Sequence, residues 1–130
     1  MSSQGFKDLK VYQSAFKGTM EIYILSKSFP KEETYSLTDQ IRRCSRSVCA
    51  NIAEAYRKRI FPKHFVSKLS DSDAECAETT VFLDFALNCG YISNKNHAHL
   101  IDQYTQVGKM LGSMMASPEK FAIKKTVATN

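Results

Sequence analysis

The sequence predicts an all-α protein and, within that class, an antiparallel up-down-up-down four-helix bundle. Apolar residues recur three and four positions apart along most of the chain, which is the spacing of one helix face. Proline and glycine are rare, with three and five among 130 residues, and most stand where one apolar segment gives way to the next. The segments between these breaks are about 20–28 residues long, and long helices joined by short connections are typical of a bundle.

The first helix is expected over residues 6–28. Phe29-Pro30 ends it, because proline cannot continue the backbone hydrogen-bond ladder and disfavours helix at the residue before it. A polar connection follows, in which Thr34 or Ser36 can cap the next helix. The side chains expected to face the core are Leu9, Tyr12, Phe16, Met20 and Tyr23.

The other three helices are expected over residues 36–59, 62–89 and 94–116. Each has an apolar stripe at helical spacing. The core positions expected in them are Leu37, Ile41, Cys44, Val48, Ile52 and Ala55, then Phe65, Leu69, Cys76, Leu83 and Leu87, and finally Leu100, Tyr104, Val107, Leu111 and Met114.

Residues at the helix ends support these boundaries. Pro62 suits a first helical turn, Gly90 suits the position just after a helix, and Ser93 can cap the last helix. Residues 1–117 are therefore expected to form the bundle, and residues 118–130 a flexible C-terminal tail.

Positive charge is concentrated in one part of the chain. Residues 40–68 hold eight Lys and Arg against one acidic residue, Glu54, whereas the whole chain has a net charge of only +5. A localised basic surface favours a polyanionic partner such as RNA or DNA. The residues expected to contact nucleic acid are Arg42, Arg46, Arg57, Lys58, Arg59 and Lys63.

The outer face of the second helix mixes arginines with small residues. At about 100° per residue, Arg42, Arg46 and Arg57 lie opposite the apolar stripe, with Ala50 and Ala53 among them. Small residues allow a neighbouring subunit to approach closely, and guanidinium groups can bind phosphate through two hydrogen bonds. Three interpretations stay open for this face: an oligomer interface, a phosphate-binding stripe, and a solvated surface with neither role.

Other residues near this helix have expected roles. Buried polar groups need partners, and the residues expected to form a structural polar core are Arg43, Asn51, Glu54 and Glu78. Tyr35 and Tyr56 flank the basic segment and are candidates for stacking on bases, although core or interface positions are commoner for such residues. Gly108 and Gly112, four apart in the last helix, are expected to let another helix approach closely.

No pattern typical of an enzyme is present. No Glu is followed by His three residues later, as di-iron bundles require, and there is no phosphate-binding glycine loop or serine nucleophile motif. The four cysteines form no close pair and are expected to be buried free thiols, so no metal or other cofactor is predicted. No signal peptide or membrane-spanning segment is visible, and a cytoplasmic protein is expected.

The middle of the chain resembles a known bacterial family. Tyr35-x-Leu-Thr-x-Gln-Ile-Arg-Arg-x-x-x-Ser-Val-x-Ala-Asn-Ile-Ala-Glu54 is similar to the signature of four-helix-bundle proteins called 23S rRNA intervening-sequence proteins, also labelled ribosomal-protein-like. The opening Phe6-Lys-Asp-Leu-Lys-Val-Tyr-Gln13 resembles their first-helix motif, and Gly90-Tyr91-Ile92 resembles the turn after their third helix. The resemblance covers residues 5–115. Cys49 stands where members often have Pro or Gly, which affects the expected helix geometry rather than the fold.

The resemblance implies a bundle that assembles into a homopentameric ring. It also implies a fold shared with the accessory protein of diversity-generating retroelements, which binds nucleic acid and a reverse transcriptase. With the basic segment, it favours a non-enzymatic, oligomeric nucleic-acid-binding protein. The alternative is a protein-interaction scaffold that docks an acidic protein partner without nucleic acid.

Overall fold

The computed structural model describes residues 5–123. Within this range the chain forms four α-helices and three short 3-10 helices, with no strand. The all-α class expected from the apolar spacing is therefore confirmed. The α-helices are α1 (Lys10–Ser26), α2 (Leu37–Arg57), α3 (Pro62–Asn88) and α4 (Asn94–Ala116), and the 3-10 helices are η1 (Gly5–Asp8), η2 (Lys31–Glu33) and η3 (Pro118–Lys120).

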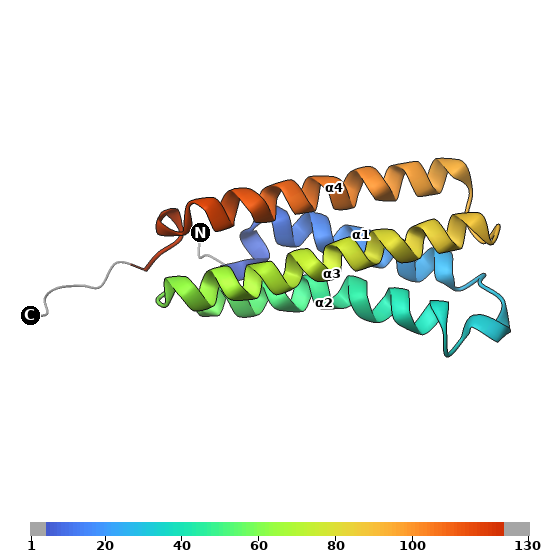
Figure 1. The fold of residues 1–130 in the computed structure, drawn as a ribbon, viewed down its shortest axis with the longest axis horizontal. Helices are drawn as coiled ribbons and strands as arrows, with labels where there is room; N and C mark the ends of the chain where they lie inside the picture. Colours follow the sequence, from blue (N-terminus) through green and yellow to red (C-terminus); the bar gives the residue numbers. More distant parts are fainter. Residues whose placement is uncertain (1–4, 124–130) are drawn as a thin grey trace, which may run out of the picture.

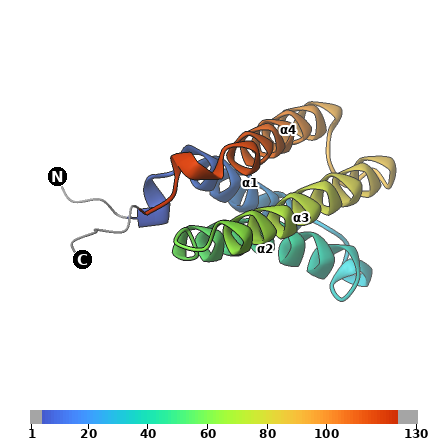
Figure 2. The ribbon, with the colours of Figure 1, turned by 60° about the vertical axis from the view of Figure 1, so that its left-hand side comes forward.

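The four α-helices lie around one core. Each packs on two neighbours in the cyclic order α1, α2, α3, α4, so α1 and α3 occupy opposite corners. Figure 1 shows the α1–α2 and α3–α4 connections at one end of the molecule and the α2–α3 turn at the other. The short helices η1 and η3 lie at the α2–α3 end in both ribbon views (Figures 1 and 2).

The core faces of α2, α3 and α4 follow the predicted stripes. All predicted core residues of α2 and α4 are buried, and in α3 only Leu87 is half-buried rather than buried. Large side chains such as Phe65, Leu69 and Tyr104 are almost completely inaccessible to solvent. Burial of a side chain of this size contributes about 1.5–3 kcal/mol relative to leaving it exposed.

The prediction for the first helix is wrong for Phe16 and Met20, which are 49% and 41% exposed. Leu9 and Tyr12 are half-buried and pack against the core, and Tyr23 is half-buried. Spacing alone cannot decide between two stripes on one helix, and here the stripe with the smaller side chains faces the core. The buried residues of α1 are Val11, Ala15, Gly18, Thr19, Ile22 and Ser26.

Hydrogen bonds explain how α1 buries polar residues. The Thr19 hydroxyl oxygen lies 2.9 Å from the Ala15 carbonyl oxygen and 3.0 Å from that of Ser45, so the hydroxyl proton always has an acceptor. The Ser26 hydroxyl donates to the Tyr23 carbonyl oxygen at 2.9 Å. These bonds offset the cost of removing the hydroxyl groups from water.

The predicted start of the first helix also differs. Leu9 adopts an extended backbone and separates η1 from α1. The Gln13 side-chain amide donates to the Lys7 carbonyl oxygen at 2.9 Å, which ties η1 back onto the first turn of α1. The chain therefore changes direction where one continuous helix was expected.

The α3–α4 connection confirms two predicted end signals. Gly90 has φ of +78°, which strongly favours glycine, and its N–H donates to Leu87 O at 2.9 Å. The Tyr91 N–H donates to Ala86 O at 2.8 Å, which completes the usual double hydrogen bond at a helix C-terminus. The Ser93 hydroxyl accepts the N–H three residues later at 3.0 Å and so caps α4.

Two further helix ends differ in detail from the sequence prediction. Ser36 precedes α2, but its side chain makes no capping hydrogen bond. Instead the Glu33 carboxylate accepts the Leu37 N–H at 3.2 Å, and an acidic group near a helix N-terminus is also favoured electrostatically. Pro62 does occupy the first turn of α3, as predicted.

The beginning of the predicted tail is structured. η3 packs on α3 and α4, and the ring of Phe121 lies 5.7 Å from the ring of the buried Phe65. The remainder of the predicted tail, residues 124–130, lies outside the described residues.

Gly18, rather than the two glycines of α4, is held close to a neighbouring helix. A Cβ atom at Gly18 would lie 3.0 Å from three atoms of the Tyr104 side chain. A Cβ at Gly108 would meet Asp73 at an ordinary 3.7 Å, and one at Gly112 would meet nothing within 4 Å. The expected close approach at Gly108 and Gly112 is therefore absent among the helices described here.

Three of the four cysteines are buried free thiols, as expected, whereas Cys89 is exposed. Burial raises the pKa of Cys44 to about 11 and that of Cys76 to about 12, and it also raises the pKa of Cys49. The ordinary thiol pKa is 9.0 here, so at pH 8 the thiolate fraction of Cys44 is about 100-fold below that of a free thiol.

We therefore expect native protein at pH 8 to react rapidly with one equivalent of an aromatic disulfide reagent, and with four equivalents after unfolding. The rapid equivalent belongs to Cys89, because only thiolates react and only this thiol is accessible. A Cys89→Ser variant is the control and should show no rapid phase. Two or more rapid equivalents in the native protein would contradict the buried arrangement.

Candidate nucleic-acid interface

The turn between α2 and α3 carries a group of cations that we call the basic cap: Arg57, Lys58, Arg59 and Lys63. Arg57, Lys58 and Lys63 are exposed, and Arg59 is half-buried. No acidic residue occurs in the sequence from residue 55 to residue 70. The cap therefore forms a positively charged end of the bundle, at the left in Figure 1.

Two of the cap cations, Arg57 and Arg59, also stabilise the fold. The Arg59 Nε donates to the Tyr56 carbonyl oxygen at 2.7 Å, and its guanidinium carbon lies 3.5 Å from the centre of the Tyr56 ring. Arg57 lies in the last turn of α2, where a cation is favoured by the helix dipole.

The other cap cations have no ion-pair partner among residues 5–123. None of the ion pairs formed between residues 5 and 123 involves Arg57, Lys58 or Lys63. All three side chains are exposed, with Arg57 and Lys58 at the end of α2 and Lys63 in the first turn of α3. They are therefore available to a polyanion.

The structure separates the two remaining predicted contact residues from the cap. Arg42 lies 15 residues before Arg57 on α2, which corresponds to about 22 Å along the helix axis. Its Nε donates to the Ser26 hydroxyl at 2.8 Å, and its guanidinium lies 4.9 Å from the Tyr23 ring centre. Arg42 therefore ties α2 to α1. Arg46 is exposed on the α1 side of α2, so the six predicted residues do not form one continuous face.

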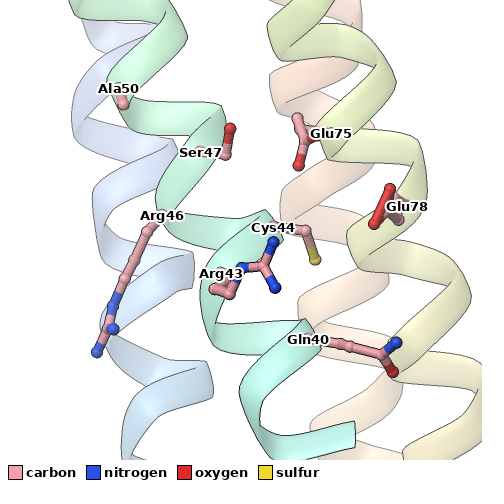
Figure 3. A pocket seen from close by; sticks show the side chains of 8 residues that line it. All are labelled: Gln40, Arg43, Cys44, Arg46, Ser47, Ala50, Glu75 and Glu78. Atoms are coloured by element: carbon pink, nitrogen blue, oxygen red, sulfur yellow. The ribbon is translucent and has the colours of Figure 1, made fainter. Parts of the chain in front are cut away.

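An open groove of about 460 Å³ follows the α2–α3 side of the molecule. Figure 3 shows Gln40 and Arg43 extending from α2 toward Glu75 and Glu78 on α3, while Arg46 points away from α3. Partial burial and the neighbouring Glu78 raise the pKa of Glu75, and the Arg43 charge partly offsets this. The groove thus combines both signs of charge, and Glu75 and Glu78 of α3 limit the basic surface on this side.

The predicted polar core is wrong for three of its four members. Arg43, Glu54 and Glu78 are exposed, and only Asn51 is buried. The Asn51 amide donates to the Ser47 carbonyl and hydroxyl oxygens at 3.0 and 3.1 Å, so it is satisfied within α2. Long charged side chains near the apolar boundary reach solvent instead of burying their charges.

Two exposed members of this set, Arg43 and Glu54, form ion pairs at the surface. Arg43 pairs with Asp39 at 3.6 Å. Glu54 pairs with Lys68 of α3 at 3.5 Å rather than with Lys58 one turn along α2. Lys68 is thereby shared with Asp71, at 3.7 Å, and Lys58 stays unpaired among the described side chains.

A second groove, of about 350 Å³, runs between α1 and α2. Phe6, Tyr12 and Phe16 form a row along it, with ring centres 4.9 Å apart in the first pair and 6.0 Å in the second. Ala50 and Ala53 form its α2 side. The exposed residues Phe16, Met20 and Ile24, which we call the α1 face, continue this apolar surface along the outside of α1.

A different apolar surface lies on the opposite corner of the bundle. Ala74, Ala77, Val81 and Phe85, which we call the α3 face, recur along the outside of α3, and all four are exposed. Val81 and Phe85 are large apolar side chains, whereas Ala74 and Ala77 leave the helix backbone accessible. The molecule therefore has two distinct apolar faces on helices that do not touch each other.

The aromatic residue best placed beside the cap is not one of those predicted. Tyr56 is covered by Arg59, and Tyr35 lies at the α1–α2 connection, at the opposite end of the molecule. Phe61 stands within the cap and is 58% exposed. A turn signal, Phe61-Pro62, was available in the sequence, but nothing in a sequence tells an exposed turn phenylalanine from one that folds back onto the core.

Neither a metal-binding cluster nor a membrane-crossing helix is found among the described residues. In residues 5–123 no three His, Cys, Asp or Glu side chains come together as metal ligands. None of the helices described is both long and apolar enough to cross a membrane.

Comparisons with known proteins agree with the fold. A family model described as 23S rRNA-intervening sequence protein matches residues 7–113. Among solved structures, the chain is similar to a protein of unknown function from the S23 ribosomal protein family of Bacteroides thetaiotaomicron, solved at 1.70 Å resolution. The two share 25% sequence identity with a TM-score of 0.74, over 82% of this chain and 95% of the other. No curated protein matches the chain.

Proposed function

This chain belongs to the 23S rRNA-intervening sequence protein family, and from that premise we propose that it is a non-enzymatic, cytoplasmic, oligomeric protein that binds the backbone of RNA or DNA. The observation that carries the proposal is the basic cap, in which Arg57, Lys58 and Lys63 have no acidic partner among the described side chains. Cationic side chains of this kind neutralise backbone phosphates, and the release of counterions from the nucleic acid favours binding.

The chemistry of the cap favours backbone contacts over base recognition. Lys58 and Lys63 supply mobile ammonium groups, and Arg57 supplies a planar group that can bind a phosphate through two hydrogen bonds. Contacts of this kind fix a nucleic acid in place but carry no sequence information. Sequence-tolerant binding is therefore part of the proposal.

Assembly is the second part of the proposal. The α1 face and the α3 face differ in composition and lie on opposite corners, so a contact between them joins one copy head-to-tail to the next. Contacts of this type close into rings when the rotation allows. The family resemblance supplies the number of subunits, five. It also supplies the antiparallel up-down-up-down order, which the placement of the connections in Figure 1 supports.

A ring would repeat the basic cap once in each subunit. Several weak phosphate contacts on one assembly then bind a long polyanion far more strongly than one contact alone, because each later contact is intramolecular. The proposal therefore needs no deep pocket and no strong single site.

Fluorescence anisotropy with labelled single-stranded RNA across a salt series tests this function. We expect binding near 50 mM salt that weakens steeply as salt rises. Changing Arg57, Lys58 and Lys63 together to Gln should reduce the slope of log K against log salt by about 2, because each phosphate contact on a single strand contributes about 0.7.

The matched control removes three exposed cations from the other end of the bundle. Lys27, Lys31 and Lys95 changed to Gln alter the net charge equally but leave the cap intact. Equal weakening by the two triple variants would contradict a localised site, and no binding by the parent protein at low salt would end the proposal.

A second candidate function is a scaffold for an acidic protein partner. The exposed apolar side chains beside Arg46 in the α1–α2 groove favour it, because such a surface suits a partner with both apolar and acidic residues. Partners captured from a lysate after nuclease treatment, and lost when Arg46 in this groove is changed to Gln, would favour this alternative over nucleic acid.

A further inference from the structure

One aromatic ring projects into solvent from the middle of the basic cap. Phe61 is 58% exposed, although exposure of so large an apolar side chain is unfavourable. Its neighbour Ile60 is also exposed, at 41%. The cap therefore offers apolar surface together with unpaired positive charge.

The backbone that carries this ring is firmly held. The Phe61 N–H donates to the Lys58 carbonyl oxygen at 2.8 Å, and the Phe61 carbonyl oxygen accepts from the Phe65 N–H at 2.9 Å. Pro62, the first residue of α3, further restricts the backbone of the residue before it. The ring is thus preorganised at a fixed place, which reduces the entropy lost when it binds something.

The other rings near this end of the molecule are already occupied. The Arg59 guanidinium covers Tyr56, Phe121 packs against Phe65, and Phe6 packs against Tyr12 in the α1–α2 groove. The ring of Phe61 makes an edge contact with the ring of the exposed His64, with ring centres 5.8 Å apart. Among the phenylalanine and tyrosine rings described near the cap, Phe61 is the one that a flat ligand can reach.

We infer that Phe61 is a stacking platform for an unpaired base, so that the ligand of the basic cap is single-stranded rather than duplex nucleic acid; this inference rests on the proposed function. A duplex presents phosphates to Lys58 and Lys63, but its base faces are hidden in the helical stack. A single strand presents both phosphates and base faces to the same turn. Phenylalanine has no hydrogen-bonding group, so the stacking accepts any base.

The test compares a Phe61→Ala variant with a Tyr35→Ala variant. Tyr35 is 95% exposed and lies at the α1–α2 connection, at the end of the bundle opposite the cap and outside both apolar faces. The probes are a labelled oligouridylate of about 12 nucleotides and an RNA duplex of the same length, both measured by anisotropy at low salt. We expect Phe61→Ala to weaken binding of the single strand by about 5- to 100-fold, to leave duplex binding within about twofold, and Tyr35→Ala to change neither.

A second variant reports the contact directly. The chain contains no tryptophan, so Phe61→Trp introduces a single fluorescent ring that should retain binding. The oligouridylate should quench its emission, and the duplex should not. Phe61→Leu, which keeps an apolar group but no aromatic face, should behave like Phe61→Ala.

The outcomes separate the two proposals. If the parent protein binds neither probe, the proposed function fails and this inference fails with it. If it binds through the cap cations but Phe61→Ala weakens single strand and duplex equally or not at all, nucleic-acid binding stands and the stacking role is overturned. Quenching of the introduced tryptophan by both probes would also overturn it.

Discussion

A Gly18→Val variant should lose about 3 kcal/mol of its free energy of unfolding, the upper end of the range for overpacking a core. Gly18 is buried in α1 where the helix crosses Tyr104 of α4, and even a Cβ atom would lie 3.0 Å from the Tyr104 ring and hydroxyl. Tyr104 is only 1% exposed, so any movement of its ring requires repacking of the surrounding core. The two methyl groups of valine must therefore displace the ring or separate the helices.

The measurement is denaturant unfolding followed by circular dichroism, with a Gly112→Val variant as the control. Gly112 lies in α4 with nothing within 4 Å of its Cβ position, so the same substitution there should change stability by no more than a few tenths of a kcal/mol. Repeating both at two protein concentrations separates folding from assembly, because only assembly makes the midpoint depend on concentration.

A double-mutant cycle identifies the cause. Tyr104→Leu shortens the opposing side chain, so Gly18→Val should cost less in that background than in the parent protein. An equal cost in both backgrounds would show that the loss comes from α1 itself and not from the contact with Tyr104.

The Gly18–Tyr104 contact also shows where prediction of the fold from sequence stops. The stripes of α2 and α4 were predicted correctly because each has one continuous apolar face at helical spacing. α1 has two stripes, and the one with the larger apolar residues lies outside. A helix that passes close to a buried tyrosine must present small residues such as Ala15, Gly18 and Thr19 to the core. That requirement comes from the neighbouring helix, so no pattern within the sequence of α1 reveals it.

Only part of the candidate site could be predicted, again because contacts between helices leave no pattern in the sequence. Four neighbouring cations, from Arg57 to Lys63, could be recognised because residues close in sequence on one turn stay close in space. Arg42 is held against α1 by its contacts with Tyr23 and Ser26. The positive charge of Arg43 lies beside the negative charges of Glu75 and Glu78 of α3. Contacts between helices determine which charges remain unpaired, and these contacts cannot be read from the order of charged residues along the chain.

Replacing Phe16 and Met20 together by Asp should abolish assembly. Both side chains are about half exposed, so the substitutions leave the core intact, and unchanged helical content by circular dichroism checks this. Two carboxylates on the α1 face cannot be desolvated against an apolar partner surface without a large energetic cost. We expect light scattering to give the mass of a single chain, 14.7 kDa, where the parent protein gives a multiple of it.

A mixing experiment tests whether the contact is head-to-tail. Val81 and Phe85 changed to Asp disable the α3 face and should give a single chain on their own. Mixed in equal amounts, the two variants retain one intact face each, and those faces complement each other across a heterologous interface. The mixture should therefore form a species of twice the single-chain mass and no larger. If each face instead pairs with its own kind, disabling one face should leave the other to form dimers, and the mixture should gain nothing.

The same pair of variants connects assembly to binding. A single chain keeps its basic cap, including Lys58 and Lys63, but loses the neighbouring copies that allow several phosphate contacts at once. Its affinity for a long single strand should fall by about 10²- to 10⁴-fold, whereas its affinity for a strand short enough to reach one cap should stay near that of the parent protein. Equal affinity of the parent and the Phe16 and Met20 variant for the long strand would show that one cap binds alone, and the ring would then have no part in recognition.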